Sequence, residues 1–304
     1  MSGSRWDELV VPASIGNLGP GFDTLGLAVS LYLRVRVREI VDDGRGAIAC
    51  TFLDGAPRGP NGIERAFTDG APRGGPSIAI EVTSEIPQRA GLGSSAAATI
   101  AGLRLRELIE GRRSPSQLLA CAARIEKHPD NAAAALVGGF TATCALSDGR
   151  LDVSRWPWPA EWQLVVATPA AMLSTEEARR ALPPCVPLQH AVFNLQRVTR
   201  LLAAVRDVDR DAVADALADR CHQPYREPLV PGLREVLDLT HPDVLGVCLS
   251  GAGPSTVAIV DRHVDEVVRV VSGIYDRAGV PCTIRHLTVP QQACREYLGQ
   301  PVMP

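Results

Sequence analysis

The hydrophobic positions of this chain change their period along its length, from every second residue to every third or fourth. From residue 31 to 41, apolar residues such as Leu33 and Val35 alternate with Arg34 and Arg36, which predicts a strand with one buried face. The other predicted strands are at 10–14, 77–82, 141–146, 162–168, 245–249, 256–260 and 281–287, and helical periodicity is found at about 94–111, 115–127, 129–137, 174–182, 189–205, 209–222, 231–239 and 262–278. This mixture of elements predicts an α+β protein.

One long stretch interrupts this pattern. Residues 42–76 are rich in Gly, Pro and Asp, and they carry the phrase Asp-Gly-Ala-Pro-Arg-Gly twice, at 54–59 and 69–74. Two copies are too few for a repeat architecture. We therefore expect a surface loop here, with one or two turns of helix at 63–67.

The chain has 304 residues, enough for one large domain or two ordinary ones. Pro157 and Pro159 follow the predicted strand at 141–146, and paired prolines break regular structure. We predict two domains, 1–155 and 156–304.

Composition narrows the class of protein. Hydrophobic residues make up 46% of the chain and charged residues 21%, as expected of a globular protein with a full core. Aromatic residues make up only 4% and the net charge is −3, which argues against nucleic-acid binding. The eight cysteines form no C-x-x-C pair, and no apolar run approaches the ~18 residues of a membrane span. We expect a cytoplasmic protein with neither a nucleic-acid nor a membrane partner.

A short glycine-rich turn leads into an alanine-rich helical segment at 89–98. Gly91 and Gly93 permit positive φ and the close approach of a ligand, and the first N–H groups of the following helix have no partner within it. Such a turn binds anions, most often phosphate, and Ser94 and Ser95 could cap the helix or reach a phosphate-bound Mg²⁺. The same residues also fit a dinucleotide-binding pattern, or a turn and cap without a ligand, and the pattern G-x-x-x-x-G-K-[ST] is absent.

Two further segments gather polar side chains. Residues 126–131 place Glu126, His128, Asp130 and Asn131 within six positions. Asp130 could simply cap a helix, whereas Glu126 precedes a proline turn where a carboxylate could hold Mg²⁺.

The second segment places Arg226 between Pro224 and Pro228, so we expect a stiff loop that presents a guanidinium to a carboxylate. Residues 174–177 have the capping-box pattern of a helix start. Arg179 on that helix is by itself more often a solvated surface residue than a ligand.

Taken together and in this order, these segments resemble the GHMP small-molecule kinases and, within them, the subfamily that phosphorylates L-homoserine. The resemblance implies an N-terminal domain with a left-handed β-α-β unit and a C-terminal ferredoxin-like domain. It also implies ATP and Mg²⁺, transfer of the γ-phosphoryl group to the side-chain hydroxyl of L-homoserine, a place in threonine biosynthesis, and a homodimer. The segments that carry it are 12–23, 87–97, 128–131, 174–183, 222–226 and 246–254.

The resemblance also implies roles for individual residues. Mg²⁺ would lie between Glu126 and a serine of the glycine-rich turn, for which Ser95 is expected rather than Ser94. Asn61 would lie near adenine. The ATP phosphates would bind to Pro87, Arg89, Ala90, Gly91, Leu92, Gly93, Ser94, Ser95 and Ala96, and the amino-acid substrate to Asn17, Asp23, His128, Asp130, Arg179 and Arg226.

The resemblance bears on the mechanism as well. Related GHMP kinases often place an aspartate base near the acceptor hydroxyl, and the corresponding position here carries Asn131, which cannot take a proton. This implies direct transfer, because loose phosphoryl-transfer transition states depend on positioning and charge neutralisation more than on a base. The expected catalytic residues are Asn131, Thr175 and Arg179. Lys127 departs from the family, which commonly has glycine at this position.

Three alternatives differ from this interpretation. The first is a GHMP kinase that acts on another small alcohol, such as mevalonate or shikimate, which Asn131 and the arginines disfavour. The second is a catalytically silent ligand sensor on the same fold, which the intact glycine-rich turn and Glu126 disfavour. The third, a nucleic-acid-binding module, conflicts with the composition.

Overall fold

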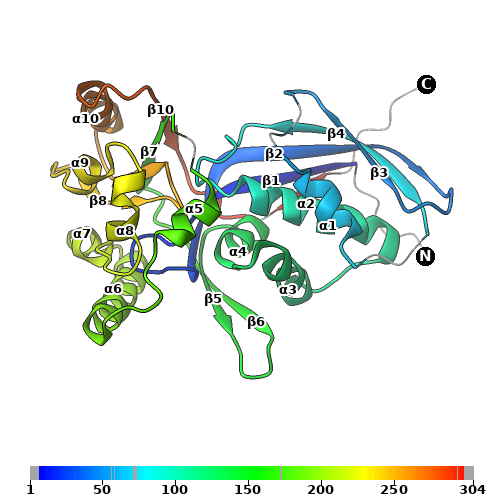
Figure 1. Ribbon diagram of the computed structural model, residues 1–304, viewed down its shortest axis with the longest axis horizontal. Coiled ribbons are helices and arrows are strands. Elements are labelled where there is room, and N and C mark those ends of the chain that lie inside the picture. The colour runs from blue at the N-terminus through cyan, green and yellow to red at the C-terminus, as the bar shows by residue number, and fades with distance from the viewer. Residues whose placement is uncertain are drawn as a thin grey trace.

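The computed structural model describes residues 7–55, 57, 59–70, 74–171, 173–292 and 294–297. Its strands form two sheets, which lie toward opposite ends of the long axis in Figure 1. Within the described residues, the first sheet has seven strands and the second has four. The mixture of helices and strands is that of the predicted α+β class.

The first sheet is organised around one long strand, β2 (Leu25–Val41). The first residues of β2 are buried, and its later part alternates between buried and exposed positions, as the apolar pattern predicts. β2 pairs antiparallel with β1, β4 and β5, and β3 pairs parallel with β4. The other strands of this sheet are β1 (Glu8–Gly16), β3 (Ile48–Phe52), β4 (Ser77–Ser84), β5 (Phe140–Ala145), β6 (Leu151–Trp156) and β11 (Arg295–Tyr297).

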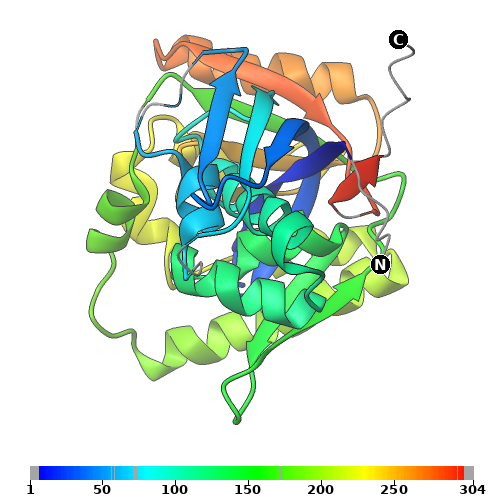
Figure 2. The same cartoon turned by 90° about the vertical axis from the view of Figure 1, so that its right-hand side faces the viewer.

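Four helices pack beside the first sheet: α1 (Gly62–Thr68), α2 (Ser94–Glu110), α3 (Pro115–Glu126) and α4 (Asp130–Val137). Figure 2 shows α2 and α3 in front of its strands. Small residues let these elements approach closely, since a Cβ on Gly102 of α2 would lie 2.3 Å from the Ile63 carbonyl oxygen of α1. A Cβ on Gly26 of β2 would lie 2.4 Å from the Asp130 carbonyl oxygen, at the start of α4.

The second sheet has the strand order β10, β7, β9, β8, with all neighbours antiparallel. The chain order of strands with the long helices α6 and α10 is β-α-β-β-α-β, which is the predicted ferredoxin-like arrangement. Its elements are β7 (Gln163–Pro169), α5 (Thr175–Arg180), α6 (Leu188–Asp207), α7 (Val213–Ala216), α8 (Gln223–Arg226), α9 (Leu233–Leu237), β8 (Val244–Leu249), β9 (Thr256–Val260), α10 (Val264–Arg277) and β10 (Cys282–Leu287).

The structure corrects several sequence expectations. Residues 223–226, expected as a stiff loop, form the short helix α8. The helix expected at 209–222 is reduced to a short helical turn and α7. Strands β3, β6 and β11 were not predicted, and β3 lies within the stretch expected as loop. Parts of the repeated phrase, residues 56, 58 and 71–73, lie outside the described residues.

The two sheets share one continuous hydrophobic core, which runs from β1 and β2 to β7 and β9. Trp158 and Trp162, next to the predicted boundary at 155/156, are buried in this core. β11 pairs with β1, so residues 295–297 lie in the first sheet although the predicted second domain includes them. No helix in the described parts of the chain is long and apolar enough to cross a membrane.

Candidate active site

The glycine-rich turn forms the start of α2 in the way expected of an anion-binding site. Gly91 and Gly93 have φ of 75° and 68°, and the N-terminus of α2 has no side-chain cap. Both positions also lack room for a side chain, since a Cβ on Gly93 would lie 2.1 Å from Ser14 Oγ and one on Gly91 2.3 Å from the Ser250 carbonyl oxygen. The first N–H groups of this 17-residue helix therefore have no partner within the helix or from a capping side chain.

A second glycine-rich loop, 250–254, lies against this turn. Ser250 Oγ donates to the Gly91 carbonyl oxygen at 2.7 Å, and the Ser255 amide donates to the Ala90 carbonyl oxygen at 3.2 Å. Loops from the two sheets thus meet at the N-terminus of α2.

A cavity of about 190 Å³ lies at this junction. Its walls come from the turn before α2, from the ends of α3 and the start of α4, from the start of α5 and from the second glycine-rich loop. The lining residues are Pro87, Arg89, Ala90, Gly91, Leu92, Gly93, Ser94, Ser95, Ala96, Glu126, His128, Asn131, Leu173, Thr175, Gly251, Ala252 and Gly253. We call it the transfer cavity, after the phosphoryl transfer that the sequence leads us to expect.

A second cavity of about 340 Å³ adjoins it and shares Arg89, Ser94 and Ser95 with it. Apolar side chains such as Phe52 and Ile86 line it together with Asn61 and Arg65. We call it the nucleoside cavity, after the expectation from the sequence that Asn61 lies near adenine. Asn61 caps α1, where its Oδ1 accepts from the Ile63 amide at 3.1 Å.

Glu126, the last residue of α3, gathers three donors on one carboxylate oxygen, Oε1. Ser95 Oγ lies 2.9 Å away, Thr99 Oγ1 2.7 Å and Arg65 Nη2 2.8 Å. The Glu126 side chain is only 7% exposed. Of the two serines considered in the sequence, Ser95 is therefore the one whose hydroxyl meets Glu126.

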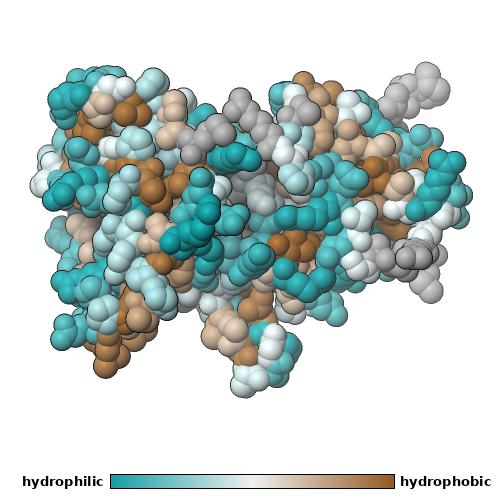
Figure 3. Space-filling view, in the orientation of Figure 1, coloured by the Kyte–Doolittle hydropathy of each residue, from teal (hydrophilic) through white to brown (hydrophobic). Residues whose placement is uncertain are grey.

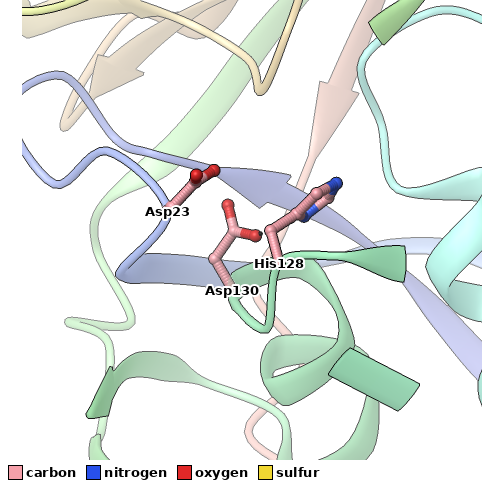
Figure 4. Close-up of side chains that lie close together, drawn as sticks. All are labelled: Asp23, His128 and Asp130. Carbon is pink, nitrogen blue, oxygen red and sulfur yellow. Dashed lines mark hydrogen bonds and ion pairs between the residues drawn. The ribbon is translucent and has the colours of Figure 1, made fainter. Parts of the chain in front are cut away.

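Asp23, His128 and Asp130 form a compact group, which we call the acidic corner. Figure 4 shows the Asp130 carboxylate between Asp23 and the His128 ring, and one ligand atom from each residue lies within 4.8 Å of the others. His128 Nδ1 is 2.8 Å from Asp130 Oδ1. Burial lowers the pKa of His128, but the hydrogen bond and the charge of Asp130 outweigh it, with help from the Asp23 charge, so the pKa is raised. This corner favours cations.

Arg179 and Arg226, which we call the arginine pair, both lie close to the ring of Phe22, beside the acidic corner. Their guanidinium carbons are 5.5 and 5.4 Å from the centre of the Phe22 ring. Arg179 Nη2 binds both oxygens of Asp23, at 2.7 and 2.9 Å. The corner and the pair therefore lie side by side with opposite charge.

Arg226, expected to bind a carboxylate from a stiff loop, is only 2% exposed. Its Nε donates to the Ala178 carbonyl oxygen at 3.3 Å and its Nη1 to the Gly251 carbonyl oxygen at 2.9 Å. Burial, with the nearby charge of Arg179, lowers the pKa of Arg226 to about 10. Among the described residues Nη2 has no hydrogen-bond partner, so this nitrogen is the part of the side chain that can meet a ligand.

His222 holds this guanidinium in place. Its Nε2 lies 2.6 Å from the Gly19 carbonyl oxygen, which can only accept, so the proton is on Nε2. Its Nδ1 then accepts from Arg226 Nη1 at 3.2 Å. Burial lowers the pKa of His222, which keeps the ring neutral beside the arginine.

Three predicted residues remain: Asn131, Asn17 and Thr175. Hydrogen bonds to neighbouring segments position the two asparagines. Asn131 lies at the start of α4, where its Oδ1 accepts from Ser14 Oγ at 3.0 Å. Asn17 Nδ2 donates to the Gly251 carbonyl oxygen at 2.8 Å, and its Oδ1 accepts from the Asp23 amide at 3.0 Å. Thr175 is the first residue of α5 and lines the transfer cavity.

The predicted residues thus fall into three adjoining places: the nucleoside cavity, the transfer cavity and the acidic corner with its arginine pair. Sequence reasoning did not select Arg65, Thr99, Phe22 or Ser14. Phe22 lies inside the segment 12–23 that carried the resemblance, so its position was within reach of that argument. Arg65 follows Asn61 by one helical turn, which the weak helical signal at 63–67 could have indicated.

Comparisons with known proteins all point to one family. The model of the GHMP kinase N-terminal domain matches residues 61–139, and that of the GHMP kinase C-terminal domain matches 201–276. A homoserine kinase of Solibacter usitatus is 39% identical over 301 residues, which cover 96% of this chain and 98% of the relative. A homoserine kinase of Moorella thermoacetica is 37% identical and covers 91% and 95%. The crystal structure of homoserine kinase from Cytophaga hutchinsonii matches with a TM-score of 0.81 at 27% identity, over 97% of this chain and 99% of that one.

Proposed function

The chain belongs to the GHMP kinases and, within them, to the homoserine kinases, and on this basis we propose that it transfers the γ-phosphoryl group of ATP to the side-chain hydroxyl of L-homoserine. The observation that carries this proposal is the pairing of the acidic corner with the arginine pair beside the transfer cavity. An amino acid brings one ammonium and one carboxylate, so it matches two neighbouring sites of opposite charge. The product is O-phospho-L-homoserine, and the reaction belongs to amino-acid biosynthesis, on the route to threonine.

We propose that ATP occupies the two adjoining cavities. We assign its adenosine to the nucleoside cavity, near Asn61, and its phosphates to Pro87, Arg89, Ser94, Ser95 and the intervening backbone of the transfer cavity. The support is the exposed N-terminus of α2, whose N–H groups and dipole favour negative charge. Arg89 lines both cavities and adds a positive charge where the phosphates would pass.

Ser95 and Glu126 are suited to hold Mg²⁺. Neighbouring ligands of an octahedral Mg²⁺, each at about 2.0–2.1 Å, lie roughly 2.9 Å apart. The Ser95 hydroxyl and Glu126 Oε1 are separated by 2.9 Å, and both are the oxygen ligands that Mg²⁺ prefers. When bound there, Mg²⁺ would neutralise negative charge on the phosphate groups.

The substrate's polar ends define its orientation. We assign the α-ammonium to Asp23 and Asp130, with His128 beside them, and the α-carboxylate to Arg179 and to the free Nη2 of Arg226. Asn17 supports this arrangement because it holds the Asp23 backbone and the Gly251 loop at once. The side-chain hydroxyl then extends toward the transfer cavity.

Transfer needs no protein base in this proposal. Asn131 lies in the transfer cavity where a base would be expected, and its amide can orient the hydroxyl or a phosphate oxygen but cannot accept a proton. Its Oδ1 is already engaged by Ser14, which fixes the amide's orientation. Thr175 lines the same cavity and can donate a hydrogen bond to the moving phosphoryl group. The proton of the hydroxyl leaves to the phosphate or to water.

The experiment that tests this function identifies the product. Phosphorus NMR of the protein with Mg·ATP and L-homoserine should show ADP and a new phosphomonoester whose signal is split by an adjacent CH₂ group. The control omits L-homoserine and should leave ATP intact. ADP and inorganic phosphate without a phosphomonoester would instead show hydrolysis and would contradict the proposal.

We also propose a homodimer in the cytoplasm. Leu188, Val192 and Leu195 are spaced at four and three positions on α6 and are 79%, 44% and 67% exposed, which makes an apolar stripe. Figure 3 shows apolar side chains gathered over α6, at the lower left of the molecule. A second copy of the chain would cover this stripe. All eight cysteines are free thiols, as is usual in the reducing cytoplasm.

A further inference from the structure

Arg65 is the cationic partner of Glu126. It extends from α1 to α3 and places Nη2 2.8 Å from the Glu126 oxygen that Ser95 and Thr99 also reach. Glu126 is 7% exposed, and Arg65 is 49% exposed. A nearly buried carboxylate needs a positive neighbour, whereas a half-exposed arginine forms only a weak ion pair and can exchange partners at small cost.

The guanidinium lies at the boundary between the two cavities. Arg65 lines the nucleoside cavity, and Glu126 and Ser95, its neighbours, line the transfer cavity. A nucleotide that fills both cavities must pass its phosphates by this point. The helix that carries Arg65 is fixed against α2, because the Ile63 carbonyl leaves no room for a Cβ on Gly102.

We propose that Arg65 neutralises Glu126 while no metal is bound and becomes a phosphate ligand of the nucleotide once the metal takes Glu126. This inference rests on the proposed function, since it concerns the same nucleotide and the same metal. The cation on the Glu126 carboxylate changes from a guanidinium to a divalent ion, so the carboxylate stays neutralised throughout. The freed guanidinium lies within reach of phosphate oxygens, which it binds well.

A purely structural role is the competing explanation, because Arg65 joins α1 to α3. The chain offers a matched control for it. Arg124 on α3 lies 2.6 Å from Asp69, the residue that caps the C-terminus of α1, and forms a second ion pair between these two parts of the chain. Arg124 lines neither cavity. Loss of Arg124 therefore removes a helix cross-link and leaves the nucleotide site intact.

The test compares wild type with Arg65→Met, Arg65→Lys and Arg124→Met in two binding measurements. Mn²⁺ alone is titrated by its effect on water proton relaxation, and adenosine and Mg·ADP are titrated by calorimetry. We expect Arg65→Met to raise the affinity for Mn²⁺ about fivefold or more, because the guanidinium no longer competes with the metal for Glu126. We expect it to lower the affinity for Mg·ADP about 10-fold or more, as for the loss of one charged hydrogen bond. The affinity for adenosine should not change.

Arg65→Lys keeps a positive charge and should leave Mn²⁺ near its wild-type affinity while it restores part of the Mg·ADP affinity. Arg124→Met should change neither. The inference is overturned if Arg65→Met leaves Mn²⁺ or Mg·ADP binding unchanged, if it weakens adenosine as much as Mg·ADP, or if Arg124→Met reproduces its effects. A wild-type protein that does not bind Mg·ADP would overturn the proposed function. The Mn²⁺ titration would still show whether Arg65 competes with the metal for Glu126.

Discussion

Arg179 on α5 and Asp23 in the loop after β1 form an ion pair in which one guanidinium nitrogen lies 2.7 and 2.9 Å from the two carboxylate oxygens. The two residues come from segments 156 positions apart, and each is about one-third exposed. The pair therefore keeps both charges compensated before an amino acid arrives. In our proposal the substrate inserts its own two charges into this pair.

Loss of either partner should selectively weaken the amino-acid substrate. We expect Asp23→Asn and Arg179→Met each to lower kcat/KM for L-homoserine by about 10- to 100-fold, the equivalent of roughly 1.5–3 kcal/mol for a charged hydrogen bond. The KM for Mg·ATP should change little, because neither residue lines the nucleoside cavity. Arg180→Met, an exposed neighbour on α5, is the control. If the KM values for L-homoserine and for Mg·ATP rose equally, the ion pair would be shown to act on the fold rather than on the substrate.

Ser95 and Ser94 should differ in their effect on the metal requirement. Ser95 Oγ lies 2.9 Å from Glu126, so Ser95→Ala should raise the Mg²⁺ concentration for half-maximal rate about 10-fold or more. Ser94→Ala removes a hydroxyl one position away and should affect this concentration less. The measurement is initial rate against free Mg²⁺ at saturating ATP. The assignment fails if Ser94→Ala gives the larger shift.

His128 should make stability depend on pH in one direction. Its pKa is raised from 6.5 in the native state, chiefly because the hydrogen bond and charge of Asp130 outweigh the effect of burial. Such a group stabilises the native state fully below pH 6.5, and this stabilisation is lost as the pH rises through the native pKa. The difference in Tm between wild type and His128→Gln should therefore be largest at acidic pH. A difference that grows with rising pH would contradict this.

Lys127 should be a site where glycine stabilises the fold. It follows the last residue of α3 as its C-cap and has φ of 69°, in the left-handed region, which costs an ordinary L-residue about 1 kcal/mol. We expect Lys127→Gly to raise the free energy of unfolding by about that amount, in a denaturant titration. Lys127→Ala removes the charge but keeps the Cβ, so it should not. Equal stability of the two variants would remove backbone strain as the explanation.

The apolar stripe of α6 should control the oligomeric state. Leu195→Lys places a charge in the middle of this stripe, and sedimentation should then show a monomer where wild type shows a dimer. Gln196→Lys adds the same charge about 100° around the helix and is the control. A dimer that survives Leu195→Lys would place the interface elsewhere, and a monomeric wild type would exclude the dimer.

The fold could be predicted from the sequence mainly where periodicity is long. The helices α2, α3, α6 and α10 and the strand β2 each repeat their pattern over many residues, and all five were expected. The strands β3 and β6 have only five and six residues and are half-exposed, so few apolar positions mark them. β11 has three residues and is stabilised by pairing with β1, at the other end of the chain.

The candidate site could be predicted only as far as its segments could be recognised. The glycine-rich turn indicated phosphate through local chemistry alone. The burial of Arg226 could not be predicted, because it depends on contacts with Ala178 and Gly251, 48 and 25 positions away. The pairing of Arg65 with Glu126 spans 61 positions and joins two helices that only the packing on α2 brings together.

Substrate-dependent ADP release tests the central claim most directly. Coupled assays with Mg·ATP would compare L-homoserine with L-serine, L-threonine, mevalonate and shikimate. The account predicts turnover only when the acceptor is L-homoserine. Asp23→Asn and Arg179→Met should lower this turnover. Turnover with mevalonate or shikimate, or no turnover with L-homoserine by a protein that binds Mg·ATP, would contradict it.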